Sequence, residues 1–270
     1  MFKTIEKIAQ KYIERGNLRK SGFYFFWKFL KSIPMITNPK MINLYSRSLF
    51  RKTLSGDYDD IYSQWIQSFQ GSPENNLSNL YLQDPLPWMY VKAIHYMEFF
   101  LKKRKDTVVI EYGGGTSTLW FSKFADTVVT IESDVKWAEE LQKIIKLKDI
   151  NNVKLNCIPP TKIMDNDDMN FLSYFKSYEG LSFKNYCTFD PLEKNQKADI
   201  ILIDGECRVQ CLKKSINFIK KNGIIVFDNS SRERYKKSID ELKKKYLYHH
   251  FEGPTTYGQG YDSTTIFVIN

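Results

Sequence analysis

The stretch "TVVIEYGGGTSTLWFSK", residues 107–123, places three consecutive glycines between an apolar run and a second apolar pattern. The first run, 107–111, ends in an acidic residue, Glu111, and the pattern over 117–125 is helical. A strand, a glycine turn and a helix N-terminus in this order bring backbone N–H groups against a polar or anionic ligand. Glycine suits such a turn because a Cβ would block close approach and disfavour a positive φ. The stretch therefore predicts a ligand-binding unit.

The rest of the chain changes character near residue 105. Before it the apolar patterns are helical, and after it short β-rich runs alternate with helical ones, which indicates βαβ units and a mostly parallel sheet. We predict a helical N-terminal extension or cap over 1–84, followed by one α/β domain over 85–270. The predicted strands are 107–111, 127–132, 153–158, 199–203, 223–227 and 264–269, and the predicted helices are 86–103, 117–125, 135–147, 207–221 and 232–245.

Residues 160–197 form the least regular part of this domain. Their length exceeds that of ordinary connections between helices and strands, so we predict a lid or a substrate loop there.

Composition narrows the class of protein. The chain has 270 residues, of which 42% are hydrophobic and 15% aromatic, a composition that favours a sizeable buried core over wholesale disorder. The net charge of +9 is spread over many short runs, which favours a solvated surface over a nucleic-acid or lipid partner. The four cysteines have no disulfide or metal-site spacing. Together with an N-terminus that lacks a signal-peptide pattern, they favour a cytoplasmic protein with reduced thiols.

One segment tests that assignment. The stretch "SGFYFFWKFLKSIPMI", residues 21–36, is densely aromatic and basic, but it is too short to span a membrane. A helix lying in the membrane interface is one interpretation. We favour a helix whose aromatic residues pack on the rest of the protein.

The glycine stretch and the strand after it point to a particular ligand. Gly113 and Gly115 fit the dinucleotide fingerprint G-x-G-x-x-G, but Thr118 stands in the third position. A glycine turn preceded by Glu111 suits a ligand with both a carboxylate and an ammonium group, as in S-adenosylmethionine. The next predicted strand ends in Glu132, which can accept both hydroxyls of a ribose diol. The candidate cofactor-binding residues are Glu111, Gly113, Gly114, Gly115, Thr116, Ser117, Glu132, Ser133 and Trp137, the last to stack on adenine.

At this point the sequence resembles a known family. The segments "VVIEYGGGTSTLWFSK", "TVVTIESDVKWAEEL", "ADIILIDGECRVQCLKKSINFIKKNGIIVFDNSSRERY" and "FEGPTTYGQGYDSTTIF" together resemble Rossmann-like S-adenosylmethionine-dependent methyltransferases. The resemblance covers about 85–270 and departs from the usual E-Y-G-S-G-x-S-T loop at Gly114. It implies a seven-stranded, mostly parallel sheet with a final antiparallel strand. The cofactor residues that it implies are Glu111, Gly113, Gly115 and Ser117, with Glu132 on the ribose.

Polar side chains end two further strands. Asp204 follows 199–203, and Asp228 and Asn229 follow 223–227, so all three are expected in the crevice at the strand ends. The set resembles the divalent-metal site of catechol-type and some sugar O-methyltransferases, where Mg²⁺ would orient a substrate hydroxyl and lower its pKa. In the other interpretation Asp204 is the base or caps a helix, and Asp228 and Asn229 make a turn. We favour the metal-free interpretation.

Arg208, Arg232 and Tyr235, with Arg234 between the last two, follow these strand ends and could bind an anionic substrate at the crevice mouth. Surface pairs with Glu206 or Glu233 are an equal alternative. The sequence thus predicts methyl transfer to a small-molecule or glycan hydroxyl. The alternatives are a scaffold domain that binds cofactor without catalysis and, third, an NAD-dependent oxidoreductase. Neither a nucleic-acid motif nor a signal for an oligomeric state is present.

Overall fold

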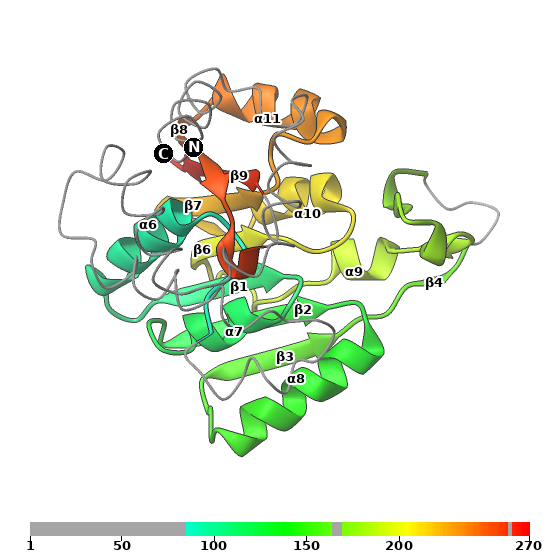
Figure 1. Ribbon diagram of the computed structural model, residues 1–270, viewed down its shortest axis with the longest axis horizontal. Helices are drawn as coiled ribbons and strands as arrows, with labels where there is room; N and C mark the ends of the chain where they lie inside the picture. The colour runs from blue at the N-terminus through cyan, green and yellow to red at the C-terminus, as the bar shows by residue number, and fades with distance from the viewer. Residues whose placement is uncertain (1–84, 164–168, 259–260) are drawn as a thin grey trace, which may run out of the picture.

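A seven-stranded sheet forms the centre of the computed structural model, which describes residues 85–163, 169–258 and 261–270 (Figure 1). The predicted extension over 1–84, with its aromatic segment 21–36, lies outside the described residues. Within them, no helix is both long enough and apolar enough to cross a membrane.

The strands follow the order β3-β2-β1-β6-β7-β9-β8. The first five in this order are mutually parallel, and β9 runs antiparallel to both of its neighbours. The α/β class and the mostly parallel seven-stranded sheet are therefore confirmed. The strand order reverses between β1 and β6, which opens a crevice at the carboxyl ends of these strands. The strands are β1 (Val108–Tyr112), β2 (Thr127–Glu132), β3 (Val153–Cys157), β6 (Ala198–Ile203), β7 (Ile219–Asp228), β8 (Leu247–Pro254) and β9 (Tyr261–Val268).

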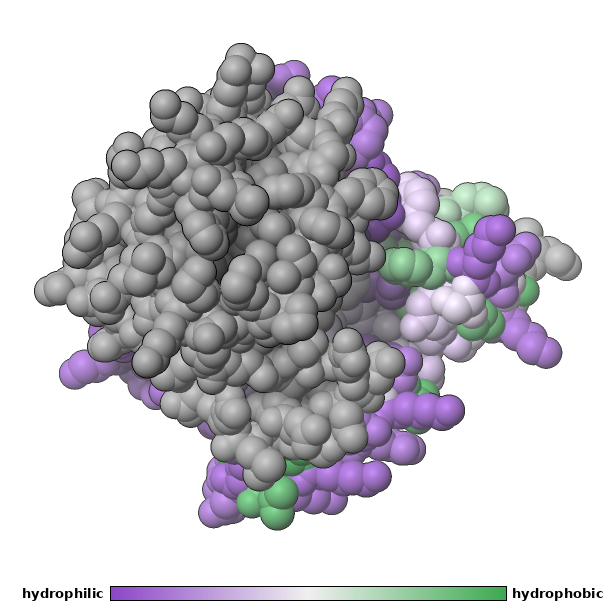
Figure 2. Space-filling view, viewed as in Figure 1, coloured by the Kyte–Doolittle hydropathy of each residue, from purple (hydrophilic) through white to green (hydrophobic). Residues whose placement is uncertain are grey.

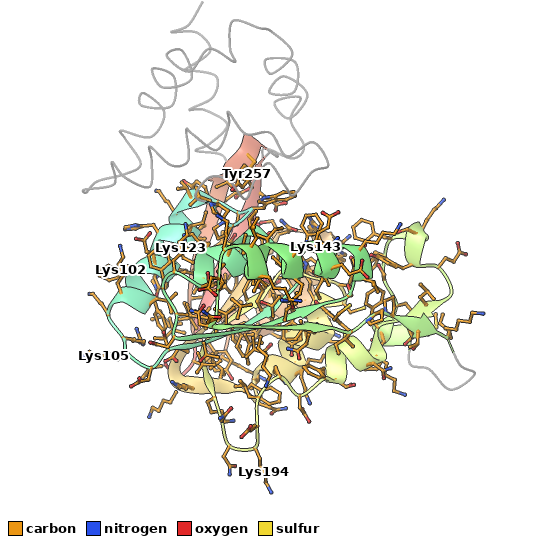
Figure 3. All side chains as sticks on the ribbon, turned by 90° about the horizontal axis from the view of Figure 1, so that it is seen from below. Lys102, Lys105, Lys123, Lys143, Lys194 and Tyr257 are labelled. Atoms are coloured by element: carbon orange, nitrogen blue, oxygen red, sulfur yellow. The ribbon has the colours of Figure 1, made fainter. Side chains whose placement is uncertain are left out.

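Helices cover both faces of the sheet. Seen edge-on in Figure 3, Lys143 on α8 lies on one side of the sheet, and Lys194, in the connection before β6, lies on the other. The helices are α6 (Val91–Lys102), α7 (Thr116–Phe121), α8 (Val135–Leu147), α9 (Lys184–Thr188), α10 (Arg208–Ser215) and α11 (Lys236–Lys243), and the short 3₁₀ helices are Met169–Phe171, Lys176–Tyr178, Glu233–Tyr235 and Thr256–Gly258.

The core is divided by the alternation of side chains along each strand. In β6, Ile200 and Leu202 pack with residues of α6 and α7, whereas Ile201 and Ile203 pack with α9, α10 and α11. All six residues of β6 are buried. Because both faces are covered, a central parallel strand needs an unbroken apolar run rather than an alternating one. The sequence "ADIILI" is such a run.

Some predicted boundaries are wrong. The helix predicted over 207–221 ends at Ser215, and β7 begins at Ile219. Ile219 is buried and pairs with Ala198 of β6, so tertiary burial overrides the helical spacing of the lysines around it. The helix predicted over 86–103 starts only at Val91, after two prolines that cannot donate a backbone hydrogen bond. The strand β8 is the seventh strand that the family resemblance implies beside the six strands predicted from the sequence pattern.

The irregular region forms an excursion between β3 and β6. It contains a two-stranded antiparallel pair, β4 (Thr161–Lys162) with β5 (Leu181–Ser182), two 3₁₀ helices and α9. The pair and the 3₁₀ helices project away from the main sheet in Figure 1. Figure 2 shows apolar residues gathered on this excursion, where Met169 and Phe175 are exposed. Residues 164–168 of the excursion are outside the described ranges.

Candidate active site

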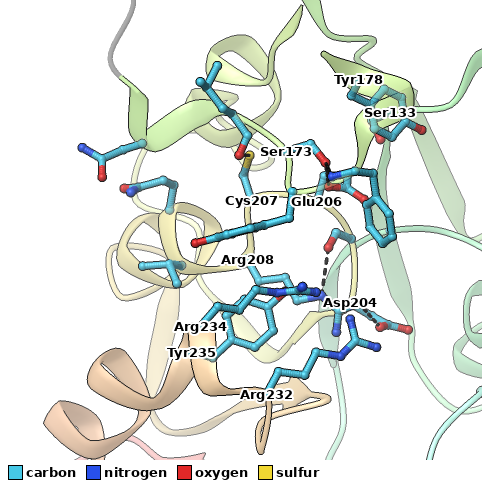
Figure 4. A pocket seen from close by; sticks show the side chains of 18 of the residues that line it. Ser133, Ser173, Tyr178, Asp204, Glu206, Cys207, Arg208, Arg232, Arg234 and Tyr235 are labelled. Atoms are coloured by element: carbon cyan, nitrogen blue, oxygen red, sulfur yellow. Dashed lines mark hydrogen bonds and ion pairs between the residues drawn. The ribbon is translucent and has the colours of Figure 1, made fainter. Parts of the chain in front are cut away.

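A pocket of about 700 Å³ opens at the carboxyl ends of the parallel strands (Figure 4). Residues from both sides of the strand-order reversal line it, together with the excursion and the segment after β7. Its lining includes the predicted cofactor residues Gly113, Gly114, Glu132 and Ser133, and the predicted catalytic or substrate residues Asp204, Arg208, Arg232 and Tyr235. The fold thus brings part of each predicted set into one cavity. The predicted residues that are not in its lining are Glu111, Gly115, Thr116, Ser117, Trp137, Asp228 and Asn229.

The glycine turn is needed for close approach between two loops. Gly113 has a φ of +91°, and a Cβ there would lie 2.7 Å from the Cα and the backbone N of Gly205. A Cβ on Gly114 would lie 2.6 Å from the Thr130 side chain. Larger residues are therefore excluded at both positions. The glycine at 113 allows the end of β1 to lie directly against the turn after β6.

The glycine N–H groups already have protein acceptors. Gly113 donates to the Ile131 carbonyl at 2.9 Å, Gly114 to Glu132 Oε2 at 2.8 Å, and Gly115 to Thr118 Oγ1 at 3.0 Å. The turn therefore offers a ligand bare backbone rather than free glycine donors.

Glu111 is fully buried at the end of β1. Its Oε2 accepts hydrogen bonds from the hydroxyls of Thr118 at 2.5 Å and Thr130 at 3.0 Å. Its Oε1 is buried with no hydrogen-bond partner among the described residues. Burial raises the pKa of Glu111 to about 7, although the neighbouring hydroxyls of Ser117, Thr118 and Thr130 lower it. A buried carboxylate oxygen without a donor beside the glycine turn fits a missing ammonium group or water molecule.

Glu132 ties the glycine turn to the end of β2. Besides the Gly114 bond, its Oε1 accepts the backbone N–H of Ser133 at 2.6 Å and of Asp134 at 2.8 Å. Burial raises the pKa of Glu132, and these N–H donors oppose that shift. Each carboxylate oxygen has a further lone pair, so the side chain can still accept a ribose hydroxyl from the pocket.

Trp137 stands in the first turn of α8, whose N-terminus is capped by Asp134 accepting the Trp137 N–H at 2.9 Å. The indole Nε1 donates to the Gly114 carbonyl at 2.7 Å. The ring lies against Gly115, 3.5 Å from the position that a Cβ would take. Trp137 therefore braces the glycine turn, and adenine stacking stays a prediction. Thr116 and Ser117, also predicted to bind cofactor, are buried at the start of α7.

Arg208 lies between the two acids that end β6 and β7. Its Nη2 is 2.8 Å from Asp204 Oδ1, and its Nη1 is 3.9 Å from Asp228 Oδ2 and donates to the Asp228 carbonyl at 2.8 Å. Its Nε donates to the Gly205 carbonyl at 2.9 Å. The Arg208 side chain is 9% exposed, which makes it a structural cation of the pocket floor rather than a mobile surface charge.

Burial raises the pKa of Asp204, while Arg208 and Arg232 lower it. Burial and the charge of Asp204 raise the pKa of Asp228 well above its usual range. Asp228 Oδ1 also accepts the Thr264 hydroxyl at 2.7 Å. The two buried acids therefore share one cation, Arg208, which lies between them.

The predicted convergence of Asp204 and Asp228 is present, but the arrangement does not fit a magnesium site. The Arg208 guanidinium stands where a divalent ion would balance both carboxylates. Asn229 follows in a left-handed turn conformation with a φ of +52°. Across the described ranges, no three His, Cys, Asp or Glu side chains are arranged to hold a metal.

The mouth of the pocket carries the remaining predicted residues and several that the sequence did not reveal. Arg232 lies 3.8 Å from Asp262, and the Tyr235 ring packs on Phe227. Opposite them stands a wall from the excursion, which no motif marks and only the irregularity of 160–197 could have indicated. This wall consists of Met169, Asn170, Leu172, Ser173, Tyr174, Phe175 and Tyr178.

Comparison with known proteins places the fold. No family model and no curated protein sequence matches the chain. The O-methyltransferase TomG from Streptomyces achromogenes, involved in tomaymycin synthesis and solved with S-adenosylmethionine, shares 14% identity over 85% of this chain and 96% of its own, with a TM-score of 0.51. An O-methyltransferase from Bacillus cereus solved with S-adenosylhomocysteine shares 15% identity over 83% and 96% respectively, with a TM-score of 0.46. The likeness to TomG shows that the chain has the Rossmann-like fold of S-adenosylmethionine-dependent methyltransferases.

Proposed function

We propose that the protein is an S-adenosylmethionine-dependent methyltransferase that acts on a hydroxyl oxygen of a small molecule or glycan. One observation carries the proposal. A single pocket joins the glycine turn and Glu132, which suit the cofactor, to Asp204, which suits proton removal from an acceptor. The methyltransferase fold supports the proposal. Because a fold alone does not determine function, the residues of the site have to support it as well.

The cofactor half of the pocket has matching chemistry. When bound, S-adenosylmethionine supplies a methyl group that its sulfonium has already activated. Glu132 lines the pocket and accepts the ribose hydroxyls. Glu111 is fully buried and is not in the lining, so its unpartnered Oε1 reaches the ammonium group through water. The bare backbone of Gly113 and Gly114, both of which line the pocket, lets the ligand approach closely.

In the acceptor half Asp204 is the proposed base. Its side chain is 26% exposed, and Arg208 holds one of its oxygens at 2.8 Å. A carboxylate held in this way can take the proton of an acceptor hydroxyl as the oxygen attacks the methyl group. The remaining task of the pocket is alignment of the acceptor for in-line displacement.

Two alternatives differ in testable ways. A metal-assisted reaction through Asp204, Asp228 and Asn229 would require Arg208 to leave its position. For an NAD-dependent oxidoreductase the third fingerprint glycine is missing. The residue in its place, Thr118, donates its hydroxyl to Glu111 and accepts the Gly115 N–H, which a glycine could not do.

Calorimetric titration tests the cofactor assignment first. We expect S-adenosylmethionine and S-adenosylhomocysteine to bind and NAD to give no heat. Release of S-adenosylhomocysteine is then measured with pools of hydroxyl-bearing small molecules and oligosaccharides. Asp204→Asn should retain cofactor binding and lose turnover. NAD binding without S-adenosylmethionine binding would overturn the proposal, and cofactor binding without turnover on any pool would favour the scaffold alternative.

A further inference from the structure

One wall of the pocket mouth carries three cations from a single short segment. Arg232, Arg234 and Lys237 follow β7 and all line the pocket. Arg232 has Asp262 at 3.8 Å, whereas no carboxylate of the described residues pairs with Arg234 or Lys237. The neighbouring Lys236, which does not line the pocket, lies 3.9 Å from Glu233. The two cations of this segment without a carboxylate partner, Arg234 and Lys237, are therefore both in the lining of the pocket.

The acidic residues of the pocket do not balance these cations. Glu132 is occupied by three backbone N–H groups, and Asp204 is paired with Arg208. Glu206 accepts the Ser173 hydroxyl at 2.7 Å. These neutral donors do not cancel the carboxylate charges, but neither Glu132 nor Glu206 forms an ion pair with Arg234 or Lys237 within the described residues. Since Arg208 is paired with Asp204 and Arg232 with Asp262, the charge beside Arg234 and Lys237 is locally positive. Such a charged cleft attracts a ligand of the opposite sign.

Arg234 is held in a way that suits recognition of an oxyanion. Its Cζ lies over the ring of Tyr174 at 4.9 Å from the centroid, and over the ring of Tyr235 at the same distance. Tyr174 comes from the excursion, and Tyr235 is anchored by its contact with Phe227. Contact through the ring faces leaves the in-plane N–H donors of the guanidinium available. Those donors match a carboxylate or a phosphate in a bidentate pair.

The tyrosines also reduce the entropy lost on binding. A free arginine side chain loses rotamer freedom when a ligand fixes it, whereas one already stacked between two walls of a pocket loses less. Tyr174 is 73% exposed, so its ring additionally offers an apolar face to an acceptor entering the mouth. In Figure 4, Arg234, Tyr235 and Arg232 lie on one side of the cavity, and Asp204 stands between them and the cofactor residue Ser133.

We propose that the methyl acceptor carries a carboxylate or phosphate group, which Arg234 binds through its in-plane donors with Arg232 and Lys237 beside it. This inference rests on the proposed function for the reaction and adds the charge class of the acceptor. Arg234, rather than Arg208, is then the principal ligand of the anion, because Arg208 already pairs with Asp204 and Asp228.

The test uses three probes with the same ring, namely glucose, glucuronate and glucose 6-phosphate. Each is titrated calorimetrically into the full-length protein, alone and with S-adenosylhomocysteine. We expect at least one acidic probe to bind about tenfold or more tightly than glucose, which is the scale of a charged hydrogen bond. The tighter of the two acidic probes identifies the preferred group.

Matched variants assign the effect to Arg234. Arg234→Gln should remove most of the preference for the acidic probes. Lys236→Gln removes the same charge from the same segment outside the pocket and should leave the preference unchanged. Equal affinity for all three probes, or equal behaviour of the two variants, would overturn the inference.

The cofactor titration separates this inference from the proposed reaction. If S-adenosylhomocysteine binds and no acidic probe is preferred, the acidic acceptor is wrong and the methyltransferase proposal stands. If the acidic probes bind through Arg234 and S-adenosylhomocysteine does not bind, the methyltransferase proposal is wrong and an anion site remains.

Discussion

Gly113 and Gly205 set the distance between the two halves of the pocket. A Cβ on Gly113 would lie 2.7 Å from the Gly205 backbone, and one on Gly205 would lie 2.1 Å from the Tyr186 hydroxyl. A residue larger than glycine at 113 would push the end of β1 away from the turn after β6, and one at 205 would displace the Tyr186 side chain. This contact between Gly113 and Gly205 holds the glycine turn beside Asp204, and the bond from Gly114 to Glu132 joins the end of β2 to the same turn.

Glu132 gives the first prediction at the residue scale. Glu132→Ala removes the acceptor of three backbone N–H groups and the proposed ribose ligand. We expect affinity for S-adenosylhomocysteine to fall by about 1.5 to 3 kcal/mol, the scale of charged hydrogen bonds. Calorimetric titration measures the change, and Glu139→Ala on the exposed face of α8 is the control. Unchanged affinity in a folded variant would remove the ribose assignment.

Glu111 gives a prediction about pH. Burial raises its pKa from 4.5 to about 7, so the ligand-free fold favours the protonated carboxyl. Its contribution to stability is complete below pH 4.5 and is lost as the pH rises through about 7. The loss amounts to something on the order of 3 kcal/mol.

Urea unfolding between pH 4 and pH 8 tests this. Glu111→Gln cannot ionise, so its stability relative to the wild type should rise across that range. Glu139→Gln, at an exposed position of α8, is the control. A constant difference between Glu111→Gln and the wild type would show that folding does not shift the pKa of Glu111.

At the scale of elements, the start of α8 positions the glycine turn. Asp134 caps the helix, and this fixes the first turn from which Trp137 reaches the Gly114 carbonyl. Leu141 and Ile144, on the buried face of the same helix, pack with Leu119 of α7. The amphipathic helix therefore aligns a loop that lies beyond its own N-terminus.

Trp137 variants distinguish this brace from adenine stacking. Trp137→Phe keeps an aromatic ring and loses a hydrogen bond worth about 1 kcal/mol, so affinity for S-adenosylhomocysteine should fall several-fold. Trp137→Ala should weaken binding further. If the Phe variant binds as tightly as the wild type while the Ala variant does not, stacking rather than the hydrogen bond is the role of this residue. Thermal unfolding of each variant controls for loss of fold.

At the scale of the whole molecule, the pocket depends on parts of the chain that are distant in sequence. The end of β2, the turn after β6, the segment after β7 and the excursion all line it. The excursion is joined to the main fold where Ser173 donates to Glu206 and the Cys207 thiol donates to the Leu172 carbonyl at 3.4 Å. The acceptor side of the cavity therefore exists only when the excursion is docked.

The arrangement of Arg208 with Asp204 and Asp228 on the floor of the pocket gives a prediction about metal dependence. Because Arg208 already stands between Asp204 and Asp228, a chelator should leave the rate of methyl transfer unchanged. The Asp204→Asn variant should reduce that rate about a hundredfold or more, as expected for loss of a general base. Release of S-adenosylhomocysteine measures both effects. Asp190→Asn, an exposed acid paired with Lys214 outside the pocket, is the control. Loss of activity with chelator and its recovery with Mg²⁺ would instead support the metal hypothesis.

Local pattern was sufficient for much of the fold. The apolar runs of β1, β2 and β6 predicted strands because central parallel strands need continuous apolar sequence. The glycine stretch and the strand-end acids Glu111 and Glu132 predicted the cofactor side, since the carboxyl ends of parallel strands meet at one edge. Local pattern misplaced the end of α10, where burial of Ile219 against Ala198 outweighs helical spacing.

The sequence by itself determined the α/β class, the strand-end acids and the glycine turn, because each depends on residues close together in the chain. Only the tertiary structure decided that Arg208 lies between Asp204 and Asp228, and that Tyr174 of the excursion meets Arg234 after β7. Sixty residues separate that last pair, and no periodicity encodes such a contact. Packing of the excursion against the main fold creates it, and with it the charge of the pocket mouth.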